Sequence, residues 1–333
     1  MAVADNFMGI LKNKIKQSIG RLFKNRVISL NKKMHIILMY HRVVEKTPEK
    51  MHDPHLFVKS DTFDMHINEI AKYFEIVTLD EMLNNDSAEK PLCAVTFDDG
   101  WLDNYETAFP ILRQNKIPAV IFIPAADIGT THCFWFEHLF FIANALSTMV
   151  DQAAYIAHFR QVVPEWNPEK LCTVSILKLT EALKSKESPV LYETIEDVYK
   201  KLNIEFCCKK ILFGWEHVSE MGQNGITFGS HGLQHDILPL LYREKKREAV
   251  FESLSILKDK TAFVSPFFSY PNGNCDLETE WFLKEAGYHG AVTTKMGLNT
   301  GRDPFRMNRI GLSESSSNTE GLLWFQICKA FYS

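Results

Sequence analysis

The sequence has no C-x-x-C pair. Its seven cysteines are scattered along 333 residues, and their number is odd. Both features argue against a disulfide framework and against a zinc-finger arrangement. We expect most of the thiols to be buried and reduced, as in a cytosolic protein.

Long apolar runs are also missing. None reaches the ~18 residues that a membrane span needs, and the N-terminus lacks the apolar core and cleavage site of a secretory signal. The formal net charge of -4 gives no reason to expect nucleic acid as a partner. The sequence predicts a cytoplasmic globular protein, and its length suits one α/β barrel.

Acidic residues are absent from positions 6–44, whereas Lys and Arg are frequent there. Residues 1–33 form a basic amphipathic arm in which apolar side chains recur near helical spacing. Those side chains are Phe7, Leu11, Ile15, Ile19 and Leu22. The pattern is typical of a helix in a membrane interface, here an anionic surface contacted through residues 7–24 at the inner face of the membrane. Alternatively, the helix packs its apolar side on the domain or on a partner protein.

Strands and helices alternate through residues 34–333. We predict strands at 35–40, 75–78, 92–97, 119–123, 226–228, 267–270 and 290–294, and helices at 62–74, 104–115, 242–258 and 277–286. This order predicts an α/β fold with a parallel sheet closed into a (β/α) barrel. The stretch from about 130 to 215 contains helical segments at 175–186 and 190–202 but no convincing strand, so we predict a helical insertion there.

Polar clusters follow four of the predicted strands. They lie at residues 40–42 (YHR), 98–100 (DDG), 230–235 (SHGLQH) and 270–273 (YPNG). In βα barrels the active site is built at the carboxyl ends of the strands. We therefore expect the four clusters to meet in one site.

Two of the clusters predict a metal centre. His231 and His235 are four residues apart, so on a helical turn both imidazoles would project from one face and bind one ion. Asp98 and Asp99 leave a strand in different directions, so that one can reach the ion and the other the substrate. Adjacent carboxylates are costly unless a cation compensates them. We expect Asp99, His231 and His235 to bind the ion, although a solvated Asp-Asp-Gly turn is the alternative.

Residues 96–100 (TFDDG) and 230–235 (SHGLQH) together resemble the first two motifs of the polysaccharide deacetylases. These carbohydrate esterases remove N-acetyl groups from chitin, peptidoglycan and poly-N-acetylglucosamine. The resemblance implies a distorted (β/α) barrel, Asp98 as the general base, and Asp99, His231 and His235 as metal ligands. It covers about residues 35–312 apart from the insertion.

The third motif of that family departs here from its usual form. The family carries an Arg two residues before a Pro, and a residue after the Pro donates a backbone N–H to the oxyanion. The corresponding residues are Ser269, Pro271 and Asn272. The Asn272 N–H can still serve, because this role needs no particular side chain. Arg306 or Arg309 is our candidate to orient Asp98 in place of the missing Arg.

The family's late catalytic histidine is absent as well, since no His follows His289. The segment 38–43 (LMYHRV) resembles the opening of a permuted branch that includes biofilm poly-N-acetylglucosamine deacetylases, where a His after the first strand acts as the acid. His41 is therefore our candidate acid. The alternative is a histidine that only hydrogen-bonds the barrel rim.

The expected function is metal-dependent hydrolysis of an N-acetyl or other N-acyl group on an amino sugar. Two His and a carboxylate are typical of a catalytic site, so we expect a divalent ion, zinc. The expected substrate is a glycan intermediate of cell-surface synthesis, which can be lipid-linked. Tyr270, Trp101 and Trp135 are candidate substrate-binding residues, although such aromatic residues are more often core. The alternatives are a metal amidase or esterase for a non-sugar compound, and an inactive membrane-associated scaffold.

Overall fold

A computed structural model of the chain describes residues 2–27, 35–84, 90–146, 152–203, 211–299 and 303–333. Within these ranges, eight strands form one curled sheet in which every pairing is parallel. The order is β10-β1-β5-β6-β7-β8-β9, with β4 beside the start of β5. The sheet strands are β1 (Ile36–Tyr40), β4 (Glu75–Ile76), β5 (Leu92–Asp98), β6 (Ala119–Ile123), β7 (Ile226–Ser230), β8 (Val264–Ser269), β9 (Gly290–Val292) and β10 (Ile310–Gly311). A separate parallel pair consists of β2 (Arg42–Val44) and β3 (Phe57–Lys59).

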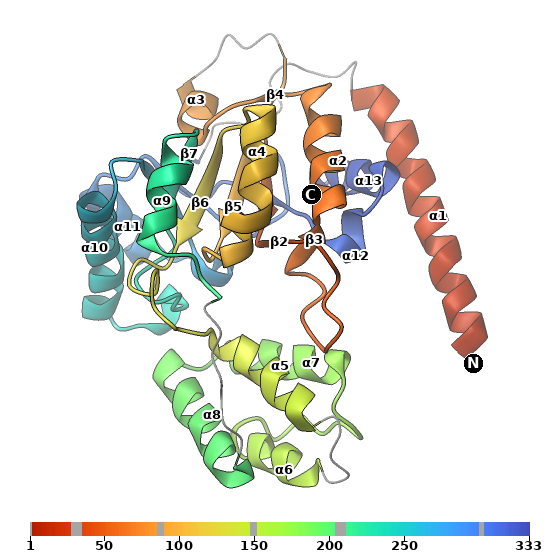
Figure 1. Cartoon of the computed structure of the whole chain (residues 1–333), viewed down its shortest axis with the longest axis vertical. Coiled ribbons are helices and arrows are strands. Elements are labelled where there is room, and N and C mark those ends of the chain that lie inside the picture. The colour runs from red at the N-terminus through yellow and green to blue at the C-terminus, as the bar shows by residue number, and fades with distance from the viewer. Residues whose placement is uncertain (1, 28–34, 85–89, 147–151, 204–210, 300–302) are drawn as a thin grey trace.

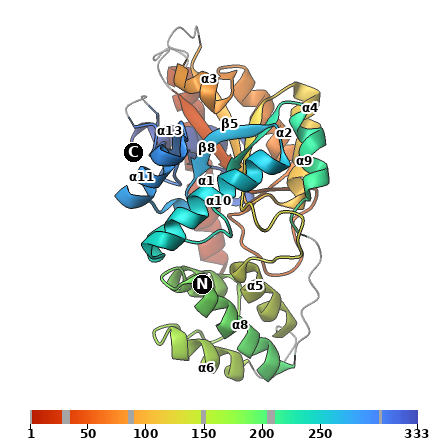
Figure 2. The ribbon, with the colours of Figure 1, turned by 90° about the vertical axis from the view of Figure 1, so that its left-hand side faces the viewer.

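Helices surround the sheet (Figure 1), and Figure 2 shows α10 on its outer side. The barrel helices are α2 (Ser60–Ala71), α3 (Leu79–Asn84), α4 (Phe109–Asn115), α9 (Trp215–Gly222), α10 (Arg243–Lys260), α11 (Leu277–Ala286), α12 (Glu314–Ser317) and α13 (Glu320–Phe331). The short turns are η1 (Asn104–Ala108), η2 (Leu238–Leu240) and η3 (Pro271–Gly273).

The segment 304–311 brings the two edges of the sheet together. On one side, the Thr293 N–H in the chain after β9 donates to the Met307 carbonyl (2.9 Å). On the other side, β10 pairs with β1 through Leu38 and Ile310. The short, irregular connection makes a distorted rather than a regular barrel, which confirms the predicted fold class.

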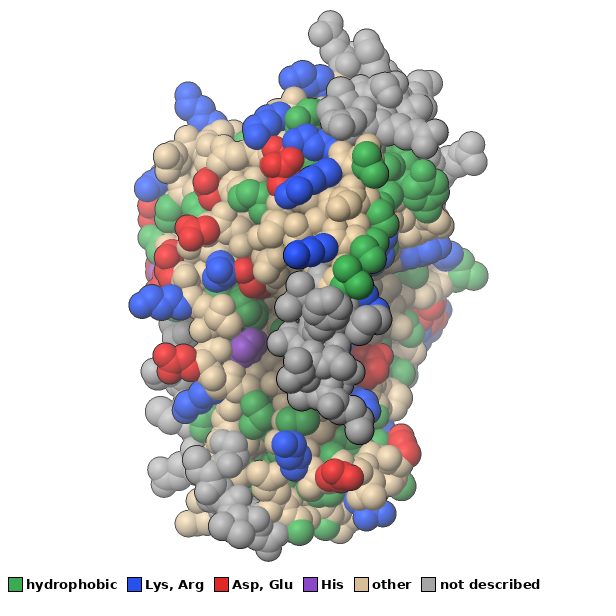
Figure 3. Space-filling model, turned by 90° about the vertical axis from the view of Figure 1, so that its right-hand side faces the viewer, with side chains coloured by type: hydrophobic (Ala, Val, Ile, Leu, Met, Phe, Trp, Pro, Cys, Tyr) green, Lys and Arg blue, Asp and Glu red, His purple; other side chains and the backbone are tan. Residues whose placement is uncertain are grey.

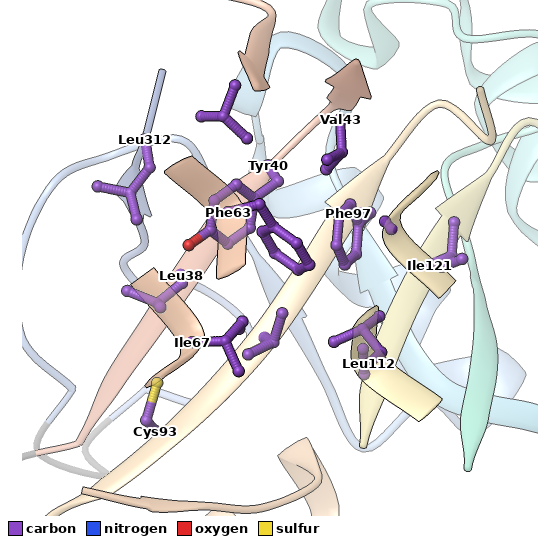
Figure 4. Packing of buried hydrophobic residues seen from close by; sticks show 14 of the residues in the cluster. Leu38, Tyr40, Val43, Phe63, Ile67, Cys93, Phe97, Leu112, Ile121 and Leu312 are labelled. Carbon is purple, nitrogen blue, oxygen red and sulfur yellow. The ribbon is translucent and has the colours of Figure 1, made fainter. Parts of the chain in front are cut away.

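The largest apolar cluster lies between the sheet and its covering helices. Tyr40 of β1, Phe63 of α2 and Phe97 of β5 meet there (Figure 4), with the Tyr40 ring 5.1 Å from that of Phe63 and 5.5 Å from that of Phe97. Since alternate strand residues face opposite sides, packing Tyr40 and Phe97 outward turns Met39 and Asp98 toward the barrel interior. The core thus sets the direction of the site residues.

Four helices form the insertion, and they lie beyond the ends of β5 and β6 (Figure 1). They are α5 (Trp135–Leu146), α6 (Ala153–Val162), α7 (Thr173–Leu183) and α8 (Ser188–Leu202). Their buried side chains make an apolar cluster separate from that of the barrel. The residues between 135 and 202 include no strand among those that the structure describes.

Helix α1 (Ala2–Val27) occupies the predicted arm, whose last residues lie outside the described part. It packs along α13 with Gly20 and Phe23 buried, and the Phe23 ring lies 4.9 Å from that of Phe331. The predicted apolar side faces away from α13, because Leu11, Ile15, Ile19 and Leu22 are exposed. The alternative in which this side packs on the domain is therefore wrong for these four residues. The side chain of Phe7 lies outside the described ones.

The predicted helix at 104–115 is interrupted. A π-helical turn, η1, covers Asn104–Ala108, and α4 follows directly. Pro110 explains the break, because proline has no N–H to donate to the carbonyl four residues earlier. Within the described residues, no helix is long and apolar enough to span a membrane.

Candidate active site

Asp98 ends β5 and is fully buried against Arg309. The guanidinium meets the carboxylate with both nitrogens, Nη1 to Oδ1 at 2.8 Å and Nη2 to Oδ2 at 2.6 Å. This bidentate geometry makes a strong charge-assisted pair and fixes the plane of the carboxylate.

Three further bonds hold Arg309. Its Nε donates to the Thr293 carbonyl (2.8 Å), and its terminal nitrogens donate to the hydroxyls of Thr96 (3.3 Å) and Ser269 (3.1 Å). Arg306 instead pairs with Glu280 at the surface. Of the two candidate arginines, the structure therefore brings only Arg309 to Asp98.

Asp99, His231 and His235 converge on one point. The Asp99 Oδ1 atom lies 3.5 Å from His231 Nε2 and 3.3 Å from His235 Nε2, and the three candidate ligand atoms all lie within 4.8 Å of one another. Ligands of a tetrahedral zinc at ~2.1 Å are separated by about 3.4 Å. The three side chains are therefore close enough together to hold a single ion.

The hydrogen bonding of His231 and Asp99 also favours a cation between them. His231 donates its Nδ1–H to the Ser269 carbonyl (2.7 Å), which leaves a lone pair on Nε2 facing Asp99. Asp99 Oδ1 is buried and has no hydrogen-bond partner among the described residues. Two lone pairs that face each other repel unless a cation or a proton lies between them. The donor set thus suits a divalent metal ion.

The spacing of the two histidines predicted a shared helical turn, and this prediction is wrong. Both lie in the loop after β7, where Gly232 has φ +81° and His235 has φ +58°. These left-handed residues turn the chain back, so that the imidazoles converge from a loop rather than from a helix face. Asp99 is also left-handed, with φ +78°.

Trp101 supports a candidate metal ligand, Asp99, instead of lining the cavity. It is fully buried, and its indole N–H donates to Asp99 Oδ2 (2.9 Å). The Arg42 guanidinium lies 4.6 Å from the indole ring and is held by Asp103 (2.8 Å). The sequence did not single out Asp103, because its partner lies 61 residues away and no local pattern marks such a pair.

The charges of the site favour ionised carboxylates. Burial raises the pKa of Asp98, but the Arg309 guanidinium and the His231 imidazole outweigh it and lower that pKa. Burial likewise raises the pKa of Asp99, yet contacts with His231 and His235 hold it well below its ordinary value. Conversely, burial lowers the pKa of His231, and the charges of Asp98 and Asp99 raise it overall.

A cavity of about 680 Å³ opens at these residues, between the barrel and the insertion. His41, Asn272 and Trp135 line it together with Asp98 and the three candidate ligands. Tyr270 does not reach the cavity, because its ring is buried in another apolar cluster and its hydroxyl donates to the Phe305 carbonyl (3.1 Å). Tyr270 and Trp101 are thus structural, contrary to the role considered for them.

The comparisons with known proteins agree with this fold. The family model described as polysaccharide deacetylase matches residues 85–291, more than half of the chain. YxkH of Bacillus subtilis, named for the same family, is 22% identical over 293 residues, which cover 85% of this chain and 73% of YxkH.

Solved structures share the architecture. The Streptococcus pyogenes deacetylase PplD, in complex with acetate, superimposes with a TM-score of 0.58 at 18% identity, over 88% of this chain and 98% of PplD. IcaB from Ammonifex degensii gives 0.54 at 17% identity, over 88% of this chain and 97% of IcaB. At these identities the similarity establishes a common fold.

Proposed function

The chain belongs to the polysaccharide deacetylase family, and we propose that it removes the N-acetyl, or another N-acyl, group from an amino sugar with a divalent ion, zinc. The observation that carries the proposal is the position of a buried, ionised Asp98 beside a three-ligand cluster on one cavity. A zinc ion held by Asp99, His231 and His235 would act as a Lewis acid and would lower the pKa of a bound water to about 7.

Three residues of the cavity wall have a place in amide hydrolysis. We assign to Asp98 the removal of a proton from the attacking water, since Arg309 fixes its orientation and keeps it ionised. The backbone N–H of Asn272 is assigned to the developing oxyanion. His41 is assigned the proton transfer to the leaving amine, which needs a donor on the same cavity.

The lining of the cavity supports an amphiphilic substrate. Apolar side chains from the insertion and from the loop after β7 line the cavity next to the polar site. They are Phe136, Phe140, Leu177, Leu191, Leu240 and Leu241. A sugar alone offers little apolar surface to such walls, whereas a lipid-linked glycan intermediate of cell-surface synthesis offers a chain.

The test is acetate release from N-acetylated sugars, with and without a lipid anchor, by the wild type and Asp98→Asn. We expect Asp98→Asn to lower kcat by about a hundredfold or more while the protein keeps its metal. Asp236→Asn, the same change elsewhere on the cavity wall, is the matched control and should retain activity.

The other outcomes separate the alternatives. Activity on non-sugar acyl amides or esters alone would indicate a metal amidase or esterase. A folded wild type that releases acyl groups from no compound would favour a scaffold and contradict the proposal.

A further inference from the structure

Helix α1 has one face that is fixed to the barrel. Gly20 approaches Gly321 of α13 so closely that a methyl group at Gly20 would lie 1.9 Å from the Gly321 carbonyl oxygen. Lys24 on the same side pairs with Glu69 and Glu320, each at 2.6 Å. The docking of α1 therefore sets which of its side chains face outward.

The opposite face carries four large apolar side chains that the described part of the chain leaves exposed. The exposed fractions are 43% for Leu11, 52% for Ile15, 41% for Ile19 and 73% for Leu22. At about 100° per residue, these four positions span an arc of about 80°. We call this stripe, with its flanking cations, the outward face. Single exposed apolar side chains are common on protein surfaces, but a row of four on one helix face is unusual.

Cations border the stripe on both sides. By the same rotation, Lys14 and Arg21 lie along one edge, and Lys12 lies along the other. Lys16 lies nearer α13, with its Nζ 6.0 Å from the centre of the Phe325 ring. Within the described residues, no ion pair engages Lys12, Lys14 or Arg21. Figure 3, which views the molecule from the side of α1, shows Lys and Arg side chains beside a row of hydrophobic ones.

We propose that the outward face of α1 binds the surface of an anionic lipid bilayer, with the helix lying in the plane of the interface. An apolar stripe with cations on both sides matches both parts of that surface, because the stripe enters the acyl boundary while the cations meet the head groups. No acidic residue occurs from 6 to 44 to oppose the attraction.

A second copy of this chain fits the outward face less well. Two such faces in contact would bring their flanking cations together, and like charges at a contact are unfavourable.

Helix α13, on which α1 packs, also contributes Gln326 and Lys329 to the cavity wall. One helix therefore lies between the helix that carries the outward face and the candidate active site. The proposal goes beyond the proposed function and does not rest on it.

The test is co-sedimentation of the full chain with vesicles of phosphatidylcholine alone, or of phosphatidylcholine with an equal part of phosphatidylglycerol. We expect binding to the anionic vesicles, weakened by salt. Ile15→Asp with Ile19→Asp should abolish it, and each of Lys14→Gln and Arg21→Gln should weaken it about fivefold. Leu277→Asp with Val190→Asp replaces two exposed apolar side chains elsewhere and should leave binding unchanged.

Circular dichroism and the thermal midpoint of each variant show whether its fold is intact, so that loss of vesicle binding by a folded variant supports the proposal. Three results would overturn it. The wild type could fail to bind anionic vesicles, or Ile15→Asp with Ile19→Asp could bind as well as the wild type. Thirdly, the wild type could be a dimer that the same double substitution separates, which would give the face to a second copy.

Discussion

Arg309 replaces, from another part of the chain, the arginine missing two residues before Pro271. Its Nη2 donates to the Ser269 hydroxyl, at the position where the family's motif has that arginine. The sequence offered Arg306 and Arg309 as candidates from their position in the segment 305–310 alone. It could not choose between them, because the choice depends on which side chain enters the barrel.

Arg309→Lys should shift the pH dependence of kcat/KM. A lysine cannot make both bonds to Asp98, so the pKa of Asp98 rises. Since the base must be ionised, activity is then lost at a higher pH on the acidic side, while the rate at higher pH changes less. The measurement is kcat/KM from pH 4 to 9.

Arg306→Lys is the control, because Arg306 pairs with Glu280 at the surface. This substitution should leave the pH profile of kcat/KM as in the wild type. An acidic limb at the same pH in Arg309→Lys and in the wild type would mean that Arg309 does not tune Asp98.

His66 is a buried ionisable residue that lies outside the cavity. The Tyr40 hydroxyl donates to its Nδ1 (3.1 Å), and its Nε2–H donates to the Ser317 carbonyl (2.7 Å). Burial lowers its pKa from 6.5 to about 4. The neutral ring therefore joins β1, α2 and α12, and protonation of the ring opposes folding.

The neutral His66 ring contributes to the free energy of unfolding. This contribution should be fully present above pH 6.5 and should be lost as the pH falls toward 4. The shift corresponds to about 3 kcal/mol. We expect His66→Gln to be less stable than the wild type at pH 7.5, with a gap that narrows toward pH 4. Urea unfolding at several pH values measures it.

His55→Gln, at an exposed site, is the control and should track the wild type throughout. A gap between His66→Gln and the wild type that is constant with pH would show that protonation of His66 does not affect folding.

Among the elements, the strands that end in polar clusters were predictable. The strand at 119–123 and the helix at 277–286 have the predicted bounds, because buried runs and helical periodicity are local signals. The geometry of the histidine pair was not predictable. A spacing of four residues fits a helix and also a loop with left-handed residues, and only the latter occurs here.

The contact between α1 and α13 depends on two glycines. Gly20→Ala should weaken it, since the added methyl group would overlap the Gly321 carbonyl oxygen. We expect a loss of about 1–3 kcal/mol in the free energy of unfolding, as for other overpacked contacts. Thermal and urea unfolding measure the change.

Gly9→Ala is the matched control in the same helix, because a methyl group there meets nothing within 4 Å. It should be neutral or stabilising by up to ~1 kcal/mol, as alanine favours helix. Equal stability of the two variants would contradict the close approach of the helices.

At the scale of the whole molecule, the cavity belongs to two parts of the chain. The sequence predicted a helical insertion by the lack of strands, but it could not predict that Phe140, Leu177 and Leu191 would form a wall of the site. Such walls arise from contacts between distant segments, which leave no periodic trace in the sequence. The same is true of the pairing of Arg309 with Asp98 across 211 residues.

Metal binding would join the carboxyl ends of β5 and β7, since Asp99 follows one strand and His231 and His235 follow the other. An ion bound only by the folded chain stabilises it by mass action. Removing the metal should therefore lower both the activity and the thermal midpoint.

The most direct test of the account is the metal content of the purified protein, followed by chelation and return of zinc. We predict about one ion per chain, loss of acetate release and a lower thermal midpoint on chelation, and recovery of both with zinc. His235→Gln should bind the ion more weakly. A folded protein that holds no metal, and whose thermal midpoint and acetate release do not respond to zinc or to a chelator, would contradict the central claim.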